Sequence, residues 1–146
     1  MAMTGSARLD AERAFTRARR QRRRAALMRR VRRLCKEESQ LPVLDEVAAG
    51  GRPARGVREI PLDAIAATLE PSRARMFDRS FRPAASARCR WQNLWLAEHR
   101  GVPLPPISVV AVGDGYAVRD GHHRVSVARA RGAVTIDATV DAVSPG

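Results

Sequence analysis

The feature that most limits the fold of this 146-residue chain is the run of arginine between residues 8 and 33. That segment holds twelve arginines against Asp10 and Glu12, a net charge of +10, and it contains no glycine or proline. Such a composition favours a helix. Residues 34–146 carry only +2 of the total charge of +12. The sequence therefore predicts an Arg-rich helical arm over residues 1–40, distinct from the domain that follows.

The arm suits a polyanionic partner, because arginines neutralise phosphates and release their counterions. Like charges at i, i+4 repel each other, and the first part of the helix is polar nearly all round, so we expect it to fray without a partner. The arginines that we single out as nucleic-acid contacts, to DNA or RNA, are Arg13, Arg17, Arg20 and Arg24.

A narrow apolar stripe runs along the later part of the arm, at Leu27, Val31 and Leu34. This stripe leaves an acidic protein open as the partner. It is too small for a membrane anchor, and no stretch of the chain is long and apolar enough to span a bilayer. Cys35 and Cys89 form neither a disulfide framework nor a zinc motif, so we expect a protein of the reducing cytoplasm.

The remainder of the chain divides into a linker over residues 41–56, beginning with a short helical turn, and a small α+β domain over residues 57–146. Hydrophobic periodicity and turn residues predict the elements of the domain. These are strands at 57–62, 107–112, 116–119 and 134–140, helices at 62–69, 84–100 and 122–131, and a loop at 70–83.

The stretch Asp120-Gly121-His122-His123-Arg124 stands at the junction between a strand and a helix. The first N–H groups of a helix have no partner within it and attract anions. His123 and Arg124 add two potential cations there, and a bound phosphate would neutralise their charge. A capped helix without chemistry stays open, as do metal binding and acid–base chemistry by His122 or His123. Adjacent histidines are poorly placed to share a metal, so we assign no metal site.

Residues 57–140 resemble the ParB/sulfiredoxin-like family. The segments that carry the resemblance are REIPLDAI (58–65), EPSRARMFD (70–78), GVPLPPISV (101–109), VGDGYAVRDG (112–121), and HHRVSVARARG (122–132) followed by TIDATV (135–140). The unit formed by the hairpin, the DGHHR stretch and the following helix is the most specific. The resemblance implies a small α+β fold that binds a nucleotide.

In ParB-type members a Gly-Glu-Arg-Arg motif cradles the triphosphate of CTP. Gly121 matches its glycine and Arg124 its last arginine, while His122 and His123 replace the residues between them. In sulfiredoxins the motif is Gly-Cys-His-Arg, and His122 stands in place of the catalytic cysteine. The resemblance also places Arg73 of the proline–arginine segment near the nucleotide. Arg75, in the same segment, is a second candidate for this position.

The resemblance thus implies phosphate contacts by Arg73, Asp120, Gly121, His122, His123 and Arg124, to a nucleoside triphosphate such as CTP, with Mg²⁺ as an open addition. The sequence ends six residues after its last predicted strand, without the helix-turn-helix module of ParB-type partitioning proteins. We therefore predict a nucleotide-binding module that associates with nucleic acid through its basic arm. The alternatives are a small-molecule phosphotransferase of the same superfamily and a degenerate module for protein contacts.

Overall fold

Short runs of β-branched and small apolar residues build a six-stranded mixed sheet in the computed structural model, which describes residues 6–31, 40–44, 51–52 and 56–143. The strands are β1 (Gly51–Arg52), β2 (Arg58–Pro61), β3 (Ile65–Thr68), β4 (Ile107–Val112), β5 (Gly115–Asp120) and β6 (Thr135–Val143). Their order is β1-β6-β4-β5-β3, and β2 also pairs with β6. Strands β3 and β5 are parallel, as are β4 and β6, whereas the other pairs are antiparallel.

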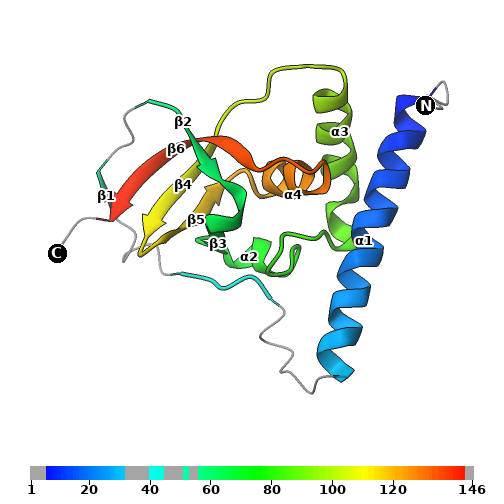
Figure 1. Cartoon of the computed structure of the whole chain (residues 1–146), viewed down its shortest axis with the longest axis horizontal. Helices are drawn as coiled ribbons and strands as arrows, with labels where there is room; N and C mark the ends of the chain where they lie inside the picture. The colour runs from blue at the N-terminus through cyan, green and yellow to red at the C-terminus, as the bar shows by residue number, and fades with distance from the viewer. Residues whose placement is uncertain (1–5, 32–39, 45–50, 53–55, 144–146) are drawn as a thin grey trace.

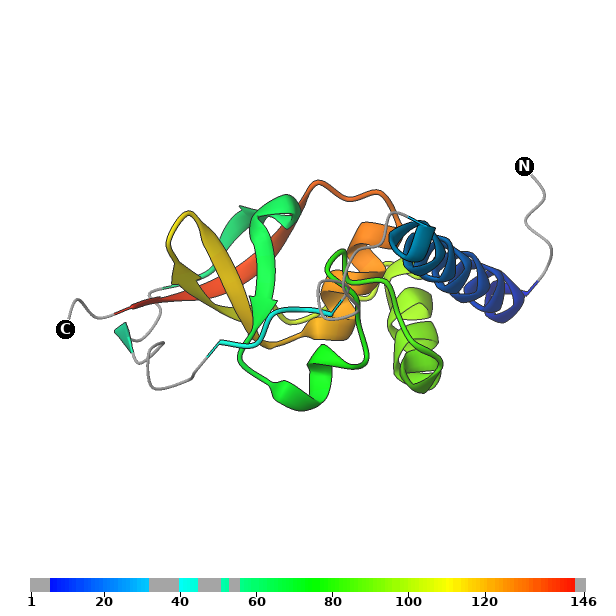
Figure 2. The same ribbon diagram turned by 90° about the horizontal axis from the view of Figure 1, so that it is seen from below.

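The helices gather at one end of this sheet (Figure 1). They are α1 (Ala7–Val31), the single-turn α2 (Pro71–Ala74), α3 (Arg88–His99) and α4 (His122–Ala130), with short 3-10 turns η2 (Leu62–Ala64) and η3 (Ala85–Ala87). Figure 2 shows α4 between the sheet and α1. The predicted α+β class is therefore confirmed, and the predicted helices at 84–100 and 122–131 match α3 and α4 closely.

The main core lies between one face of the sheet and α4, together with the loop after α2. Its larger members are Leu41, Ile60, Leu62, Ile65, Phe77, Phe81, Ile107, Val109, Val118 and Val125. Val125 and Ala128 of α4 are buried in this core. The start of the helix is therefore fixed against the end of β5. This packing sets the position of the junction that the sequence singled out.

The helix predicted over residues 62–69 is wrong. Leu62–Ala64 form a single 3-10 turn, and Ile65–Thr68 then form strand β3, paired with β5. The Ala- and Leu-rich sequence favours a helix locally, but burial of Ile65 and Thr68 against the sheet outweighs that propensity. Residues 41–44, at the start of the predicted linker, are extended rather than helical, and Pro42 and Leu44 form backbone hydrogen bonds with Thr68 on the outer side of β3. The predicted division between arm, linker and domain remains a prediction.

Helix α1 is confirmed, but its first part is not the frayed polar helix that the sequence predicts. Ala11, Phe15 and Ala18 lie at i, i+4 and i+7 and are buried. Phe15 makes an edge-to-face contact with Trp91 of α3, with ring centroids 5.4 Å apart. In contrast, Leu27 and Val31 of the predicted apolar stripe are 59% and 70% exposed, and Leu34 lies outside the described residues. The N-terminal half of α1 is therefore part of the packed body.

Candidate functional site

The backbone at the start of α4 depends on glycine. Gly121 has a φ of +111°, which other residues rarely adopt. A Cβ atom at this position would come within 2.8 Å of Ile107 Cβ and 3.3 Å of the guanidinium carbon of Arg124. Gly121 lets the chain turn from β5 directly into α4, and it leaves the first N–H groups of the helix facing outward. Those groups carry the positive end of the helix dipole.

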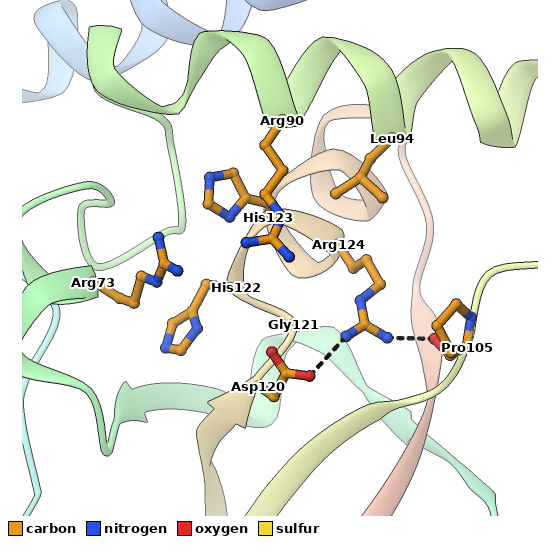
Figure 3. A pocket seen from close by; sticks show the side chains of 9 residues that line it. All are labelled: Arg73, Arg90, Leu94, Pro105, Asp120, Gly121, His122, His123 and Arg124. Carbon is orange, nitrogen blue, oxygen red and sulfur yellow. Dashed lines mark hydrogen bonds and ion pairs between the residues drawn. The ribbon is translucent and has the colours of Figure 1, made fainter.

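A cavity of about 180 Å³ opens at this helix start (Figure 3). All six residues predicted to contact phosphate line it, namely Arg73, Asp120, Gly121, His122, His123 and Arg124. They come from α2, from the end of β5 and from the first turn of α4. Arg90 and Leu94 of α3 and Pro105 of the segment before β4 complete the lining. The structure thus brings together residues from four segments that are distant in the sequence.

Arg124 forms one wall of the cavity and is fully engaged with the protein. Its guanidinium donates to the carbonyl oxygens of Pro105 and Pro106, at 2.9 Å for the latter, and it pairs with the Asp120 carboxylate at 3.2 Å. The side chain is only 14% exposed. Arg124 therefore ties α4 to the segment before β4, and Asp120 offsets its charge. The N-cap residue of α4 is Gly121, and it makes no side-chain capping bond.

His122 is buried at the base of the cavity. Its Nε2 atom lies 2.5 Å from Thr68 Oγ1, and its ring stacks on Phe77 at a centroid distance of 6.3 Å. Burial lowers the pKa of His122 from 6.5 to about 4, and the Arg73 guanidinium and the neighbouring imidazole of His123 act in the same direction. His122 is therefore neutral at physiological pH and held by Thr68.

His123 is also buried, and its ring packs edge-to-face with Phe77, with ring centroids 5.1 Å apart. Burial lowers its pKa to about 4 as well, followed by the effects of Arg73 and Arg90. Of the two potential cations in the first turn of the helix, His123 is therefore neutral near pH 7, which leaves Arg124. The protein keeps both rings neutral beside two arginines, because desolvation penalises the imidazolium form.

The cations that face the cavity are Arg73 and Arg90. Arg73 is partly buried and donates to the thioether of Met76 at 3.2 Å, whereas Arg90 is exposed on α3. Arg90 was not predicted from the sequence. It shares a helix face with Leu94 at i, i+4, but only the way α3 crosses the start of α4 reveals that this face meets the cavity. Arg75, weighed beside Arg73, is exposed and does not line the cavity.

The arginines predicted to contact nucleic acid are exposed on α1 and none lines the cavity; they are Arg13, Arg17, Arg20 and Arg24. In the part of the chain that the structure describes, no three His, Cys, Asp or Glu side chains are grouped so as to hold a metal ion. Cys89 is a free, exposed thiol, while Cys35 lies outside the described residues. No helix among residues 6–31, 40–44, 51–52 and 56–143 is both long and apolar enough to cross a membrane.

Comparison with solved structures finds four chains that are similar to this one. No family profile matches the chain, and no curated protein matches its sequence. The fold is similar to the crystal structure of sulfiredoxin from Arabidopsis thaliana, with a TM-score of 0.43 and 22% sequence identity, over 60% of this chain and 86% of that one.

Proposed function

We propose that the chain is a ParB/sulfiredoxin-like module that binds the phosphate groups of a nucleotide at the start of α4. The observation that carries this proposal is the convergence of two arginines and a helix N-terminus on one cavity. Arg73 and Arg90 reach it from separate helices, and Gly121 and the first residues of α4 line it. The N–H groups of the first turn of a helix have no partner within the helix and attract anions. Because His122 and His123 are neutral, they can donate or accept hydrogen bonds without a charge of their own.

The size of the cavity suits the phosphate groups rather than a whole nucleotide. Its volume of about 180 Å³ is below the roughly 300–1,000 Å³ of complete small-molecule sites. A second groove, of about 350 Å³, lies on the other side of Arg124 and Pro105 and shares both residues with the cavity. We therefore place the phosphates in the cavity and the nucleoside in the groove.

The lining of the second groove suits a nucleoside. Pro103, Leu104 and Ile136 offer an apolar wall for a base. The carboxylates of Glu59, Glu98 and Asp137 line the same groove, and they can accept hydrogen bonds from ribose hydroxyls or from the exocyclic amino group of cytosine or adenine.

The chemistry of the cavity favours binding over phosphoryl transfer. Thr68 already holds Nε2 of His122, and the one carboxylate in the lining, Asp120, is paired with Arg124. A phosphotransferase would need His123 as its base. Asp120 alone does not make a metal site, so Mg²⁺ would arrive with the phosphates, as it does at sites with one or two carboxylates.

The test is calorimetric titration of the full chain with CTP, UTP, ATP, GTP and pyrophosphate, with and without Mg²⁺. We expect at least one nucleotide to bind, and Arg73→Gln or Arg90→Gln to weaken it about tenfold, the effect of losing a charged hydrogen bond. Arg79→Gln removes an exposed arginine from the loop after α2, outside both sites, and should bind normally. Absence of binding by every nucleotide and by pyrophosphate would leave the protein-contact module as the better account.

A second candidate function is nucleic-acid binding through α1. Arg13, Arg17, Arg20 and Arg24 share one exposed face of the helix, opposite Ala11, Phe15 and Ala18. They extend over about 16 Å of helix. The packing of α1 on α3 holds the first half of this face in a fixed position, which lowers the entropy lost on binding.

A further inference from the structure

A basic groove lies where the first half of α1 meets the ends of α3 and α4. Its volume is about 520 Å³. Arg13 and Arg17 of the exposed face of α1 line one side, and Trp95, His99 and Arg131 line the other. Asp10, Ala14 and Ala130 complete the lining. Its lining carries three arginines against Asp10, so the groove stays positive although Glu98 pairs with one of them, Arg131. Helices α1 and α3 run side by side there (Figures 1 and 2).

The far side of this groove is a stack of flat side chains. Trp95 and His99 are stacked with centroids 4.9 Å apart and planes 13° apart. The guanidinium of Arg131 lies over the Trp95 ring, 5.2 Å from its centroid, and Glu98 holds Arg131 by an ion pair of 3.4 Å. Trp95 also packs on the cluster around Phe15 and Trp91, so the stack is held in place before any ligand arrives.

We propose that this groove binds a single strand of nucleic acid, with its phosphates along Arg13 and Arg17 and a base that extends the stack formed by Trp95, His99 and Arg131 at its exposed end. The inference rests on the second candidate function and gives it a site. Sites for single strands combine a basic groove that follows the backbone with aromatic or arginine planes that stack on bases. The arm has the charges but no aromatic platform on its exposed face, and the fold supplies that platform from α3.

The groove favours a single strand over a duplex. Because α1 and α3 pack on each other through Phe15 and Trp91, a ligand lies in the surface groove beside that contact. The volume of the groove, about 520 Å³, is within the range of small-molecule sites and takes part of one strand rather than a double helix. The bases of a duplex are also stacked on one another and are closed to a platform of this kind. An acidic peptide could meet the arginines, but it would make no use of the flat stack.

The experiment measures fluorescence anisotropy of a labelled 20-nucleotide single strand and of the matching duplex, over a range of salt concentrations. We expect the full chain to bind the single strand more tightly than the duplex. The groove variant His99→Leu/Arg131→Gln should weaken single-strand binding roughly tenfold, the effect of one lost stacking contact. It should change duplex binding much less.

Two further variants separate the groove from the rest of the arm. Arg20→Gln/Arg24→Gln should weaken binding of both nucleic acids and lower the slope of log K against log salt by about 1.4 for the single strand. Arg58→Gln/Arg79→Gln removes two exposed arginines elsewhere and serves as the control for net charge. Circular dichroism and the thermal midpoint check that every variant is folded.

The outcomes distinguish the inference from the function on which it rests. If the groove variant binds the single strand like the control while the Arg20/Arg24 variant does not, nucleic-acid binding stands and the groove is rejected. Equal affinity for duplex and single strand also rejects it. If neither nucleic acid binds but polyglutamate does, both proposals fall and the arm recognises an acidic protein.

Discussion

Two buried histidines give the candidate site an unusual balance of charge. His122 and His123 stand beside Arg73 at the positive end of a helix, and their neutrality keeps that region from accumulating further cations. An anion in the cavity would oppose this preference and raise both pKa values, because a negative charge stabilises the imidazolium form. The same residues that stay neutral in the free protein would then be able to take up a proton on binding.

This arrangement predicts a loss of stability in mild acid. Both folded pKa values are about 4, below the value of about 6.5 expected in the unfolded chain. Between pH 6.5 and 4 the unfolded state therefore binds more protons, and the free energy of unfolding falls as the pH falls. We expect each histidine to contribute about 1–3 kcal/mol to this fall, measured by urea denaturation at pH 7.5 and at pH 4.5.

The variant His122→Gln/His123→Gln provides the comparison for that prediction. It should be less stable than the natural chain at pH 7.5 but should lose less stability on acidification. Sulfate, a divalent anion that does not titrate in this range, should reduce the loss in the natural chain and not in the variant. A pH dependence of equal size in both proteins would show that other groups control acid unfolding.

Among the secondary-structure elements, α1 combines two environments. Its first half buries Phe15 against Trp91, and Arg88 of α3 lies 4.9 Å from the centroid of the Phe15 ring. Its last two turns expose Leu27, Met28 and Val31. The helix therefore packs on the rest of the protein as far as Arg22 and presents an open surface over its last two turns.

Phe15→Ala should destabilise the protein by about 3–5 kcal/mol, because it removes a fully buried ring and leaves a cavity beside Trp91. Leu27→Ala, on the same helix but exposed, should change the free energy of unfolding by less than about 0.5 kcal/mol. Urea denaturation followed by tryptophan fluorescence measures both. Similar small effects for the two variants would mean that α1 is a detached arm.

The strengths and failures of sequence reasoning are also clearest for elements. The alternating run at 107–112 and the turn at 113–115 predict the β4–β5 hairpin, because both signals are local. The packing of Phe15 gives no such local signal. Ala11, Phe15 and Ala18 form only a weak apolar stripe among the ten arginines of α1, and the contact with Trp91 depends on the tertiary fold. The local sequence of residues 65–68 favours a helix. Their pairing with β5 on one side and with Val43 on the other is a tertiary effect, which local propensity does not reveal.

For the candidate site, the sequence motif supplies the junction and its neighbours, whereas the whole fold supplies the rest. Gly121 and Arg124 could be found from their spacing at a strand–helix boundary. Arg90 and the groove platform of Trp95 and His99 could not, because each depends on how α3 crosses other helices. The packing of Phe15 of α1, Trp91 of α3 and Val127 of α4 brings the three helices together. No local sequence pattern indicates that packing.

On the scale of the whole molecule, α1 contacts the segment that positions Arg73 at the cavity. Arg22 of α1 donates to the carbonyl oxygen of Arg75 at 3.4 Å, in the segment that carries Arg73 and Phe77. Burial lowers the pKa of the Arg22 guanidinium, and the Asp78 carboxylate opposes that effect. Trp91, which packs on α1, donates to Ser126 of α4 at 2.9 Å. The helix thus contacts the elements that place both cations of the cavity.

We therefore expect Arg22→Gln to weaken phosphate binding although Arg22 does not line the cavity. Loss of its bond to Arg75 frees the segment that positions Arg73, and we expect the affinity for pyrophosphate, measured by calorimetry, to fall about threefold to tenfold. Arg23→Gln removes the adjacent exposed charge and is the matched control, since it lowers the net charge equally. If the two variants bind pyrophosphate alike, long-range electrostatics explains the effect of α1, and the contact between Arg22 and Arg75 has no role in shaping the cavity.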